Sequence, residues 1–348
     1  MCLGAFVAII AGLSGLGLDH VFYDTSTHYL ELISNLKNLV RWVRIINPKM
    51  KGNIMKDLKG ICVALSTPFT DDGENLDESA LKNHIDDRLE AGVHIILVCG
   101  GTGEFAYLRP EERRKIAEIA AKHIDGKADF MVQASAINTR DAIENAKHAE
   151  GLGADGLLIL PPYFEGPDYD GVYYHYEKIS EAVPVPIMMY NIPAHSNIDL
   201  TPEFVERTKQ IENVRYIKDS MEDLKRIQEL LMVGGDRIKV FNGGDSIAFF
   251  SLVAGCPGCV WGASNAMPKE SVKLYDLVQA GNLTEANELW KRMFPANLFF
   301  STHVYNVAVK AATNLSGRKI GPCRKPQMPL TDAEMNQLKA ALKPLGIE

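Results

Sequence analysis

The feature that most constrains the fold of this chain is a regular alternation of short apolar runs with helix-length segments from Gly60 onward. Each apolar run is followed by a segment in which apolar residues recur at helical spacing. The runs are almost continuously apolar, which is typical of parallel strands buried on both faces. There are eight of them, ICVALSTPF, HIILVCGGTGE, FMVQAS, GLLILPPYF, PIMMYNIP, VRYIKDS, IKVFNGGD and GCVWGAS.

Eight strand–helix units predict a (β/α)8 barrel, a TIM barrel of class α/β, over residues 58–280. A doubly wound open sheet is the alternative. It would need a glycine-rich dinucleotide fingerprint after the first strand, where STPFTDDGE supplies none. After Gly281, further helical segments follow one another without strands between them. Residues 281–348 are therefore expected to form a C-terminal helical region packed on the barrel.

Residues 1–57 differ from the rest and are expected to be an N-terminal extension. The run LGAFVAIIAGLSGLGL is too short for a membrane span, and no basic residue precedes it as in a secretory signal. A basic stretch, LKNLVRWVRIINPKMK, follows. The segment is therefore open to three interpretations: an amphipathic extension, an over-long start before Met50 or Met55, or a signal or anchor.

Charge and cysteine usage narrow the class of protein. The net charge of −7 gives no basic field for a phosphate backbone, so nucleic acid is not expected as a partner. The six cysteines are scattered, which suits reduced thiols and a cytoplasmic location. CPGC, the run from Cys256 to Cys259, has no second CxxC or paired histidines at ligand spacing, so neither metal nor redox chemistry is expected there.

The residues that close the strands are the candidates for chemistry, because the active sites of such barrels lie at the carboxyl ends of the strands. Lys218 closes the sixth predicted strand and Tyr190 the fifth, so the two are expected to be neighbours. An amine among apolar side chains is disfavoured as an ammonium, so part of it should be a free nucleophile. A phenol nearby could move protons to and from a carbinolamine.

The GGTGE loop after the second strand offers consecutive backbone N–H groups and the Thr102 hydroxyl, which suit a small carboxylate. Amine, phenol and anion site together predict a Schiff-base site for a 2-oxo acid. Each part alone has a structural interpretation. Lys218 could be solvated or paired with Asp219, Tyr190 could be a core aromatic, and GGTGE could be a tight turn. The other strand ends are Thr67, Ser135, Tyr163, Gly243 with Asp245, and Ser264.

The motifs GGTGEF, YNIP and IKD, in this order and spacing, resemble the dihydrodipicolinate synthase / N-acetylneuraminate lyase family of class I aldolases. The resemblance extends from about Leu58 to the C-terminus and includes GPCRKPQMPL. It implies a (β/α)8 barrel with a C-terminal helical region, commonly a homotetramer, and no metal or organic cofactor in catalysis. A homotetramer or homodimer with a small-molecule substrate and no membrane partner is therefore expected.

The resemblance also implies roles for individual residues. Lys218 corresponds to the Schiff-base lysine and Tyr190 to the acid/base tyrosine. Gly101 and Thr102 correspond to the loop that holds the carboxylate of the 2-oxo acid. Gly243 corresponds to a position beside the substrate in the loop after the seventh strand.

Three positions depart from the synthase pattern. Gly101 stands where the synthase has the first of two threonines. Phe164 stands where it has a second tyrosine, donated across a subunit interface. His195 follows YNIP where it has an arginine for the aldehyde substrate's carboxylate, and an imidazole cannot reproduce a bidentate guanidinium.

These departures bring the chain closer to family members that act on 2-keto-3-deoxy sugar acids. The sequence therefore predicts a Schiff-base-forming lyase for such an acid, with His195 among the substrate-binding residues. No motif separates aldol cleavage from dehydration. One alternative is a 4-hydroxy-tetrahydrodipicolinate (dihydrodipicolinate) synthase, which condenses pyruvate with aspartate semialdehyde. Another is a non-catalytic binding protein on the same barrel.

Overall fold

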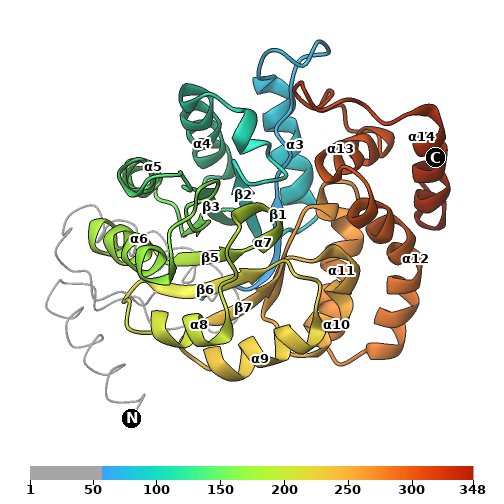
Figure 1. The fold of residues 1–348 in the computed structure, drawn as a ribbon. Helices are drawn as coiled ribbons and strands as arrows, with labels where there is room; N and C mark the ends of the chain where they lie inside the picture. The colour runs from blue at the N-terminus through green and yellow to red at the C-terminus, as the bar shows by residue number, and fades with distance from the viewer. Residues whose placement is uncertain (1–56, 348) are drawn as a thin grey trace, which may run out of the picture. The chain divides into compact units, whose positions relative to one another are not determined.

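The structure is a computed structural model that describes residues 57–347. The expected N-terminal extension lies outside these residues, apart from Asp57. Eight parallel strands pair in chain order and close on themselves, so the predicted TIM barrel is confirmed (Figure 1). The strands are β1 Gly60–Ala64, β2 Ile95–Val98, β3 Asp129–Gln133, β4 Gly156–Ile159, β5 Ile187–Asn191, β6 Val214–Asp219, β7 Lys239–Asn242 and β8 Gly258–Trp261.

Helices surround the barrel, as Figure 1 shows. Those that connect or follow the strands are α3 Glu78–Glu90, α4 Pro110–Ile124, α5 Thr139–Gly151, α6 Tyr169–Ala182, α7 Pro193–Ser196, α8 Pro202–Thr208, α9 Leu224–Gly234, α10 Ala248–Val253 and α11 Pro268–Gln279. Short 3-10 turns lie at η1 Phe105–Tyr107, η2 Asp245–Ile247 and η3 Ala263–Asn265. The chain then continues through α12 Leu283–Thr302, α13 Tyr305–Leu315, α14 Asp332–Leu342 and η4 Lys343–Leu345. None of the helices in the described residues is long and apolar enough to span a bilayer.

Local sequence explains where several helices begin. Asp77, Asn138 and Asp168 are N-caps, and each side chain accepts a hydrogen bond from the backbone amide three residues later. Such caps satisfy N–H groups that the first helical turn leaves without partners. Pro110 is the first residue of α4, where its missing N–H has no cost.

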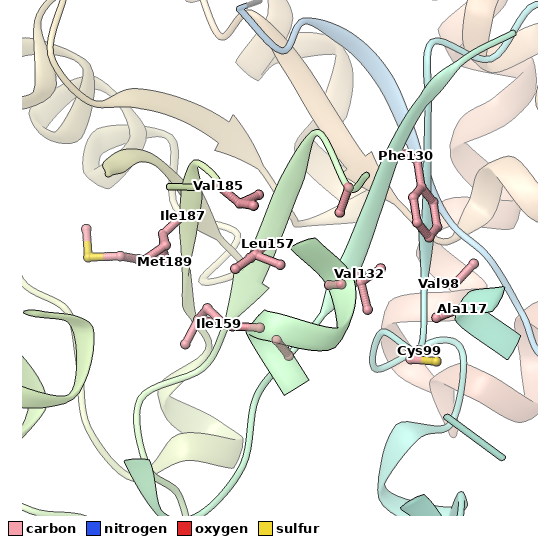
Figure 2. Close-up of a cluster of buried hydrophobic side chains, with 14 of the residues drawn as sticks. Val98, Cys99, Ala117, Phe130, Val132, Leu157, Ile159, Val185, Ile187 and Met189 are labelled. Carbon is pink, nitrogen blue, oxygen red and sulfur yellow. The ribbon is translucent and has the colours of Figure 1, made fainter. Parts of the chain in front are cut away.

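Strand residues alternate between two parts of the core. One set points outward and packs against the helices; Figure 2 shows part of it, including Val98, Val132, Leu157, Ile159 and Ile187. The other set fills the barrel interior. Both faces of the sheet are therefore apolar, which explains the continuous apolar runs in the sequence. The interior set comprises Leu58, Cys62, Ala64, Ile95, Leu97, Met131, Leu158, Leu160, Met188, Tyr190, Tyr216, Phe241 and Val260.

The C-terminal helices share a hydrophobic core with the barrel. Trp261 of β8 is buried against Trp290 of α12, and its indole N–H donates a hydrogen bond to the Asn297 side chain at 3.2 Å. Residues from α10 to α14 join the same cluster. The helical tail therefore packs directly on the barrel wall.

A buried ion pair ties the loop after β2 to this tail. The Lys310 ammonium of α13 lies 2.7 Å from one carboxylate oxygen of Glu104, and both side chains are at most 2% exposed. The other oxygen accepts hydrogen bonds from the Arg324 backbone N–H and the Gln327 amide. Burial lowers the pKa of Lys310, and the Glu104 carboxylate partly offsets this. Because Glu104 belongs to GGTGE, this pair anchors the end of that loop.

Replacing Glu104 by Gln should destabilise the protein by about 3–5 kcal/mol, because it leaves the Lys310 ammonium buried without a counter-charge. Urea unfolding followed by circular dichroism would measure the change. Glu78→Gln is the control, since it removes a half-exposed ion pair with Lys115 at 3.4 Å and should cost at most about 1 kcal/mol. Equal effects of the two substitutions would contradict the structural importance of the buried pair.

Candidate active site

Tyr190 and Lys218 lie side by side on the inner wall of the barrel. They are paired in register on β5 and β6, so both side chains point to the same face. The Lys218 Nζ lies 4.1 Å from the centroid of the Tyr190 ring, and the two residues are 7% and 8% exposed. The structure thus brings together the amine and the phenol that the sequence analysis predicted to be neighbours.

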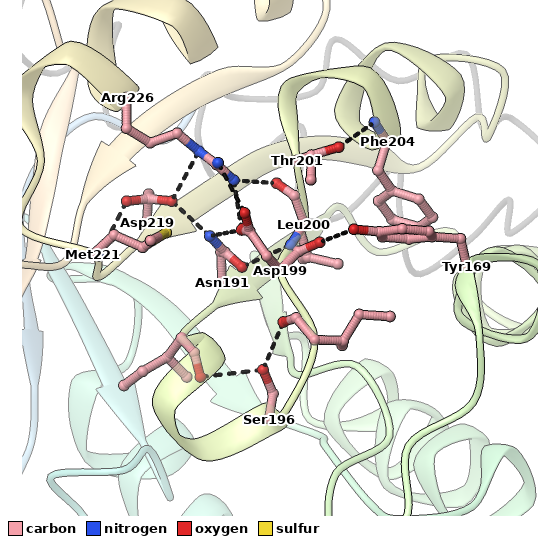
Figure 3. A network of polar contacts seen from close by, with 12 residues as sticks. Tyr169, Asn191, Ser196, Asp199, Leu200, Thr201, Phe204, Asp219, Met221 and Arg226 are labelled. Atoms are coloured by element: carbon pink, nitrogen blue, oxygen red, sulfur yellow. Dashed lines mark hydrogen bonds and ion pairs between the residues drawn. The ribbon is translucent and has the colours of Figure 1, made fainter.

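Lys218 is not paired with Asp219. Within residues 57–347 the Lys218 ammonium forms no ion pair within 4.0 Å. Asp219, the next residue on the strand, takes part instead in the polar network shown in Figure 3. The sequence alternative in which Asp219 neutralises Lys218 is therefore not realised. Strand alternation explains this, since adjacent residues of a strand point to opposite faces.

The outward neighbours of the two residues hold β5 and β6 together. The Asn191 amide donates hydrogen bonds to Asp219 at 2.8 Å and to Asp199 at 3.0 Å. Its oxygen accepts from the Leu200 backbone N–H at 2.9 Å. Arg226 binds Asp199 at 2.6 Å and approaches Asp219 at 3.8 Å. Burial raises the pKa of the Asp219 carboxyl, although the hydrogen bond from Asn191 opposes this. The network fixes the strand ends that carry Tyr190 and Lys218.

Gly243, after β7, leaves the space that the Lys218 side chain occupies. A Cβ at this position would lie 2.5 Å from the Lys218 Cε and would also collide with the Ser220 hydroxyl. The backbone N–H of Gly243 donates to the Asp219 carbonyl at 2.7 Å, which sets this close approach. Any side chain at position 243 would push Lys218 away from its present position.

The GGTGE loop has backbone groups available for an anion. In the described part of the chain, the N–H groups of Gly101, Thr102 and Gly103 donate no hydrogen bond. Thr67 donates to the Gly103 carbonyl at 2.7 Å and Asn306 to the Gly101 carbonyl at 3.1 Å, so the loop is held from its carbonyl side. The loop can therefore offer several N–H donors to one carboxylate.

Two of the departures from the synthase pattern lie at exposed positions. Phe164, in the loop after β4, is 75% exposed and has a left-handed backbone with φ 76°. His195 lies on the short helix α7 and is also exposed. Neither side chain is buried with the pair of Lys218 and Tyr190. The third departure, Gly101, has no atom within 4 Å of the place where a Cβ would stand.

The sequence analysis missed one residue at the barrel mouth. The hydroxyl of Tyr305, from α13, donates a hydrogen bond of 2.8 Å to the carboxyl of Asp245. Asp245 is 3% exposed, and burial raises its pKa to about 7 despite the Tyr305 hydrogen bond and the nearby Lys218. The position of Asp245 two residues after Gly243 was a signal in the sequence. Tyr305 had none, because it lies 60 residues further along the chain in a helix outside the barrel.

Cys256 and Cys259 are free, buried thiols. Burial raises the pKa of Cys256 to about 12, which keeps it protonated and unreactive near neutral pH. Among the described residues, no group of three or more His, Cys, Asp or Glu side chains is arranged to hold a metal ion. The CPGC motif is therefore part of the packed wall at β8.

Replacing Asn191 by Ala should cost about 2–4 kcal/mol of stability, because it leaves buried partners without hydrogen bonds. It should also slow reductive trapping of pyruvate on Lys218 by about 10- to 100-fold, since the strand ends lose their alignment. Asn138→Ala is the control; it removes the N-cap of α5 at a cost of about 1 kcal/mol and should leave trapping unchanged. Wild-type trapping in the Asn191 variant would show that the network is not needed for alignment.

Known proteins share this fold and part of this sequence. The profile of the "Dihydrodipicolinate synthetase family" matches residues 57–345. The 4-hydroxy-tetrahydrodipicolinate synthase of Geotalea uraniireducens is 32% identical over 289 residues, which are 83% of this chain and 99% of that protein. The crystal structure of Acinetobacter baumannii dihydrodipicolinate synthase with pyruvate is similar, with a TM-score of 0.80, 29% identity and coverage of 84% of this chain and 100% of that one. YagE, a prophage protein of the same family from E. coli K12 solved with pyruvate, has a TM-score of 0.80, 29% identity and the same coverage. The chain therefore belongs to the dihydrodipicolinate synthetase family, whose members are lyases of the class I aldolase type.

Proposed function

We propose that this protein is a Schiff-base-forming lyase that acts on a 2-oxo acid. Lys218 is the nucleophile, Tyr190 the acid/base group, and Gly101 and Thr102 the site for the substrate carboxylate. The observation that carries the proposal is the buried Lys218 amine, which has no ion-pair partner among the described residues and lies against the Tyr190 ring at 4.1 Å. Gly243 supports this arrangement, because it leaves room for the lysine.

In this proposal the Lys218 amine adds to the C2 ketone, and loss of water from the carbinolamine forms an iminium ion. The iminium ion then accepts the electron pair of the C3–H bond, whose proton Tyr190 takes, or the electron pair of the C3–C4 bond, which breaks to release an aldehyde. A carboxylate held by the N–H groups of the GGTGE loop would keep the ketone close to the amine. Such positioning can lower the barrier by several kcal/mol.

The names of the relatives favour one substrate pair. The curated relatives with 31–33% identity are named 4-hydroxy-tetrahydrodipicolinate synthase. Two of the similar structures contain pyruvate. These names support condensation of pyruvate with aspartate semialdehyde more than the sugar-acid reaction that the sequence departures favoured. The synthase reaction is therefore the first candidate.

Three residues favour the second candidate, a lyase for a 2-keto-3-deoxy sugar acid. Gly101 and Phe164 lack the hydroxyl groups that the resemblance places at these positions in the synthase. His195 is an exposed imidazole where an arginine would bind a second carboxylate. A substrate that is bound only through its C1 carboxylate requires none of these three groups. The same three differences are also compatible with a non-catalytic binding protein. That alternative is the weakest, because the chain retains both Lys218 and Tyr190.

We also propose a homotetramer or homodimer as the assembled state. Phe164 occupies the position from which the resemblance expects an aromatic residue to be donated across a subunit interface. Its ring is 75% exposed in the single chain, and Ile137 of the preceding βα loop is 54% exposed. Burial of these apolar side chains between subunits would be favourable.

Lys218→Ala should abolish the adduct that borohydride traps with pyruvate, because Lys218 is the amine of residues 57–347 that lies over the Tyr190 ring. Intact-mass and peptide analysis would show the loss, and circular dichroism would show that the fold remains. Lys239→Ala is the matched control, since this lysine begins β7 and pairs with Asp57 at 2.7 Å. An adduct retained in the Lys218 variant would refute its role. Wild-type protein that forms no adduct with any 2-oxo acid would restore the binding-protein alternative.

His195→Arg should lower the KM for aspartate semialdehyde by about tenfold if the missing guanidinium limits the synthase reaction, because a bidentate ion pair replaces an exposed imidazole. Steady-state condensation with pyruvate would measure this in the wild type and the variant. In parallel, both proteins would be incubated with 2-keto-3-deoxygluconate, and product release would be followed. Turnover of that acid, with no condensation in either protein, would reject the synthase and support the second candidate.

A further inference from the structure

The hydroxyl of Tyr305 lies inside the barrel mouth, although the residue belongs to the C-terminal helices. Gly262 directly follows β8, and a Cβ at this position would collide with the Tyr305 hydroxyl oxygen. Two ring carbons of Tyr305 lie 2.9 Å from the same position. The Tyr305 phenol therefore lies directly over the backbone of Gly262. It occupies the space that the side chain of any other residue at position 262 would fill.

Two glycines on neighbouring strand ends thus admit two functional side chains. Gly243, after β7, leaves room for the Lys218 side chain, and Gly262, after β8, leaves room for Tyr305. Strands β7 and β8 are paired in the barrel. Lys218 and Tyr305 therefore enter the mouth over adjacent parts of the wall.

Asp245 connects these two side chains. It accepts the Tyr305 hydrogen bond at 2.8 Å, and its carboxyl interacts electrostatically with Lys218. Tyr305 in turn interacts electrostatically with Tyr190, whose own hydroxyl has no hydrogen bond in the described residues. The titratable groups that face this pair are Lys218 of β6, Glu222 in the loop after it, Cys259 of β8 and Tyr190 of β5.

We propose that Tyr305 and Asp245 form a proton relay that serves Tyr190 during imine formation on Lys218. This inference rests on the Schiff-base function proposed above. It gives this chain a source of protons that does not depend on hydroxyl groups at positions 101 and 164, where the chain has Gly and Phe. Tyr190 touches the reacting atoms in this scheme, while Tyr305 and Asp245 act through it as positioning and proton-supplying residues.

The net result of the relay is the transfer of one proton from Asp245 to the departing hydroxide. When the carbinolamine C–O bond breaks, the nitrogen lone pair forms the C=N bond and Tyr190 protonates the departing hydroxide, which leaves as water. The Tyr190 phenolate takes the Tyr305 hydroxyl proton, which points to Asp245 at rest. Tyr305 then takes a proton from the protonated Asp245 carboxyl, so the hydrogen bond between the two reverses. Tyr305 ends unchanged, and the new Asp245 carboxylate lies near the cationic iminium on Lys218, which it stabilises. Hydrolysis of the imine runs the same steps in reverse.

Burial supports this role by raising the pKa of Asp245 to about 7. A carboxyl with its ordinary pKa would already be ionised at neutral pH and could not donate a proton. With the raised pKa, Asp245 is protonated below about pH 7 and loses its proton above it. Imine formation should therefore be fastest below this pH and should decline as the pH rises through it.

Tyr305→Phe and Asp245→Asn test the relay with the full-length protein and pyruvate as the probe. The first removes only a hydroxyl, and the second keeps an acceptor for Tyr305. Two rates would be measured from pH 5.5 to 8.5, a window of about 1.5 units on either side of the Asp245 pKa of about 7. They are formation of the borohydride-trapped adduct on Lys218 and exchange of the pyruvate methyl protons with deuterated solvent.

Each variant should lose about 10- to 100-fold in maximal trapping rate at low pH. The half-saturating pyruvate concentration should stay unchanged, and the decline near pH 7 should disappear.

Tyr275→Phe is the control, since it removes the hydroxyl of a tyrosine on α11 that packs against His94 away from this pair. It should reproduce wild-type rates and pH dependence, and thermal melts would verify that all variants fold. Trapping by Tyr305→Phe at the wild-type maximal rate and pH profile would overturn the relay. So would a loss confined to the half-saturating concentration, which would indicate a substrate contact instead. A wild-type protein that forms no adduct would reject the Schiff-base function itself, whereas a normal adduct with unaffected variants rejects the relay alone.

Discussion

The strict alternation of side chains along β5 and β6 is the constraint on which the site depends. Tyr190 pairs with Lys218 and Asn191 with Asp219, so one pair points into the barrel and the other points out. The outward pair is joined by a hydrogen bond of 2.8 Å. The same register that aligns the amine with the phenol therefore also locks the two strand ends. A slip by one residue would exchange the two faces and place the lysine outside the barrel.

The C-terminal helices complete the barrel mouth. Three residues in the first half of helix α13 contact three different parts of the barrel mouth. Tyr305 binds Asp245, Asn306 binds the Gly101 carbonyl, and Lys310 binds Glu104. The loop that offers its N–H groups to an anion is thus held by contacts from a helix that begins 204 residues later in the chain than Gly101, at Tyr305. The tail is part of the site as well as part of the core, so truncation of α13 would disturb both.

Burial determines the electrostatics of the mouth. Lys218 and Asp245 are both under 10% exposed, and no carboxylate of residues 57–347, Asp245 included, lies in ion-pair contact with the lysine. Such an environment favours the neutral form of the Asp245 carboxyl, because a buried carboxylate is poorly solvated there. The raised pKa of Asp245 is one result. Glycines at positions 243 and 262 create the room in which these groups meet, so steric and electrostatic requirements are satisfied by the same loops.

The sequence alone determined the barrel, because eight continuously apolar runs separated by helical segments leave few other ways to bury both faces of a parallel sheet. It also determined that Lys218 and Tyr190 are neighbours, since consecutive strands of a barrel pair and their carboxyl ends share one edge. Only the tertiary structure decided that Lys218 is the residue that faces inward and that Asp219 joins a network with Asn191, because packing selects which face of the strand lines the barrel interior. The contact between Tyr305 and Asp245 also depends on the tertiary structure, because no local pattern in a C-terminal helix shows which loop that helix will contact. Local spacing determines the elements and their order, whereas contacts between distant segments depend on how whole faces pack.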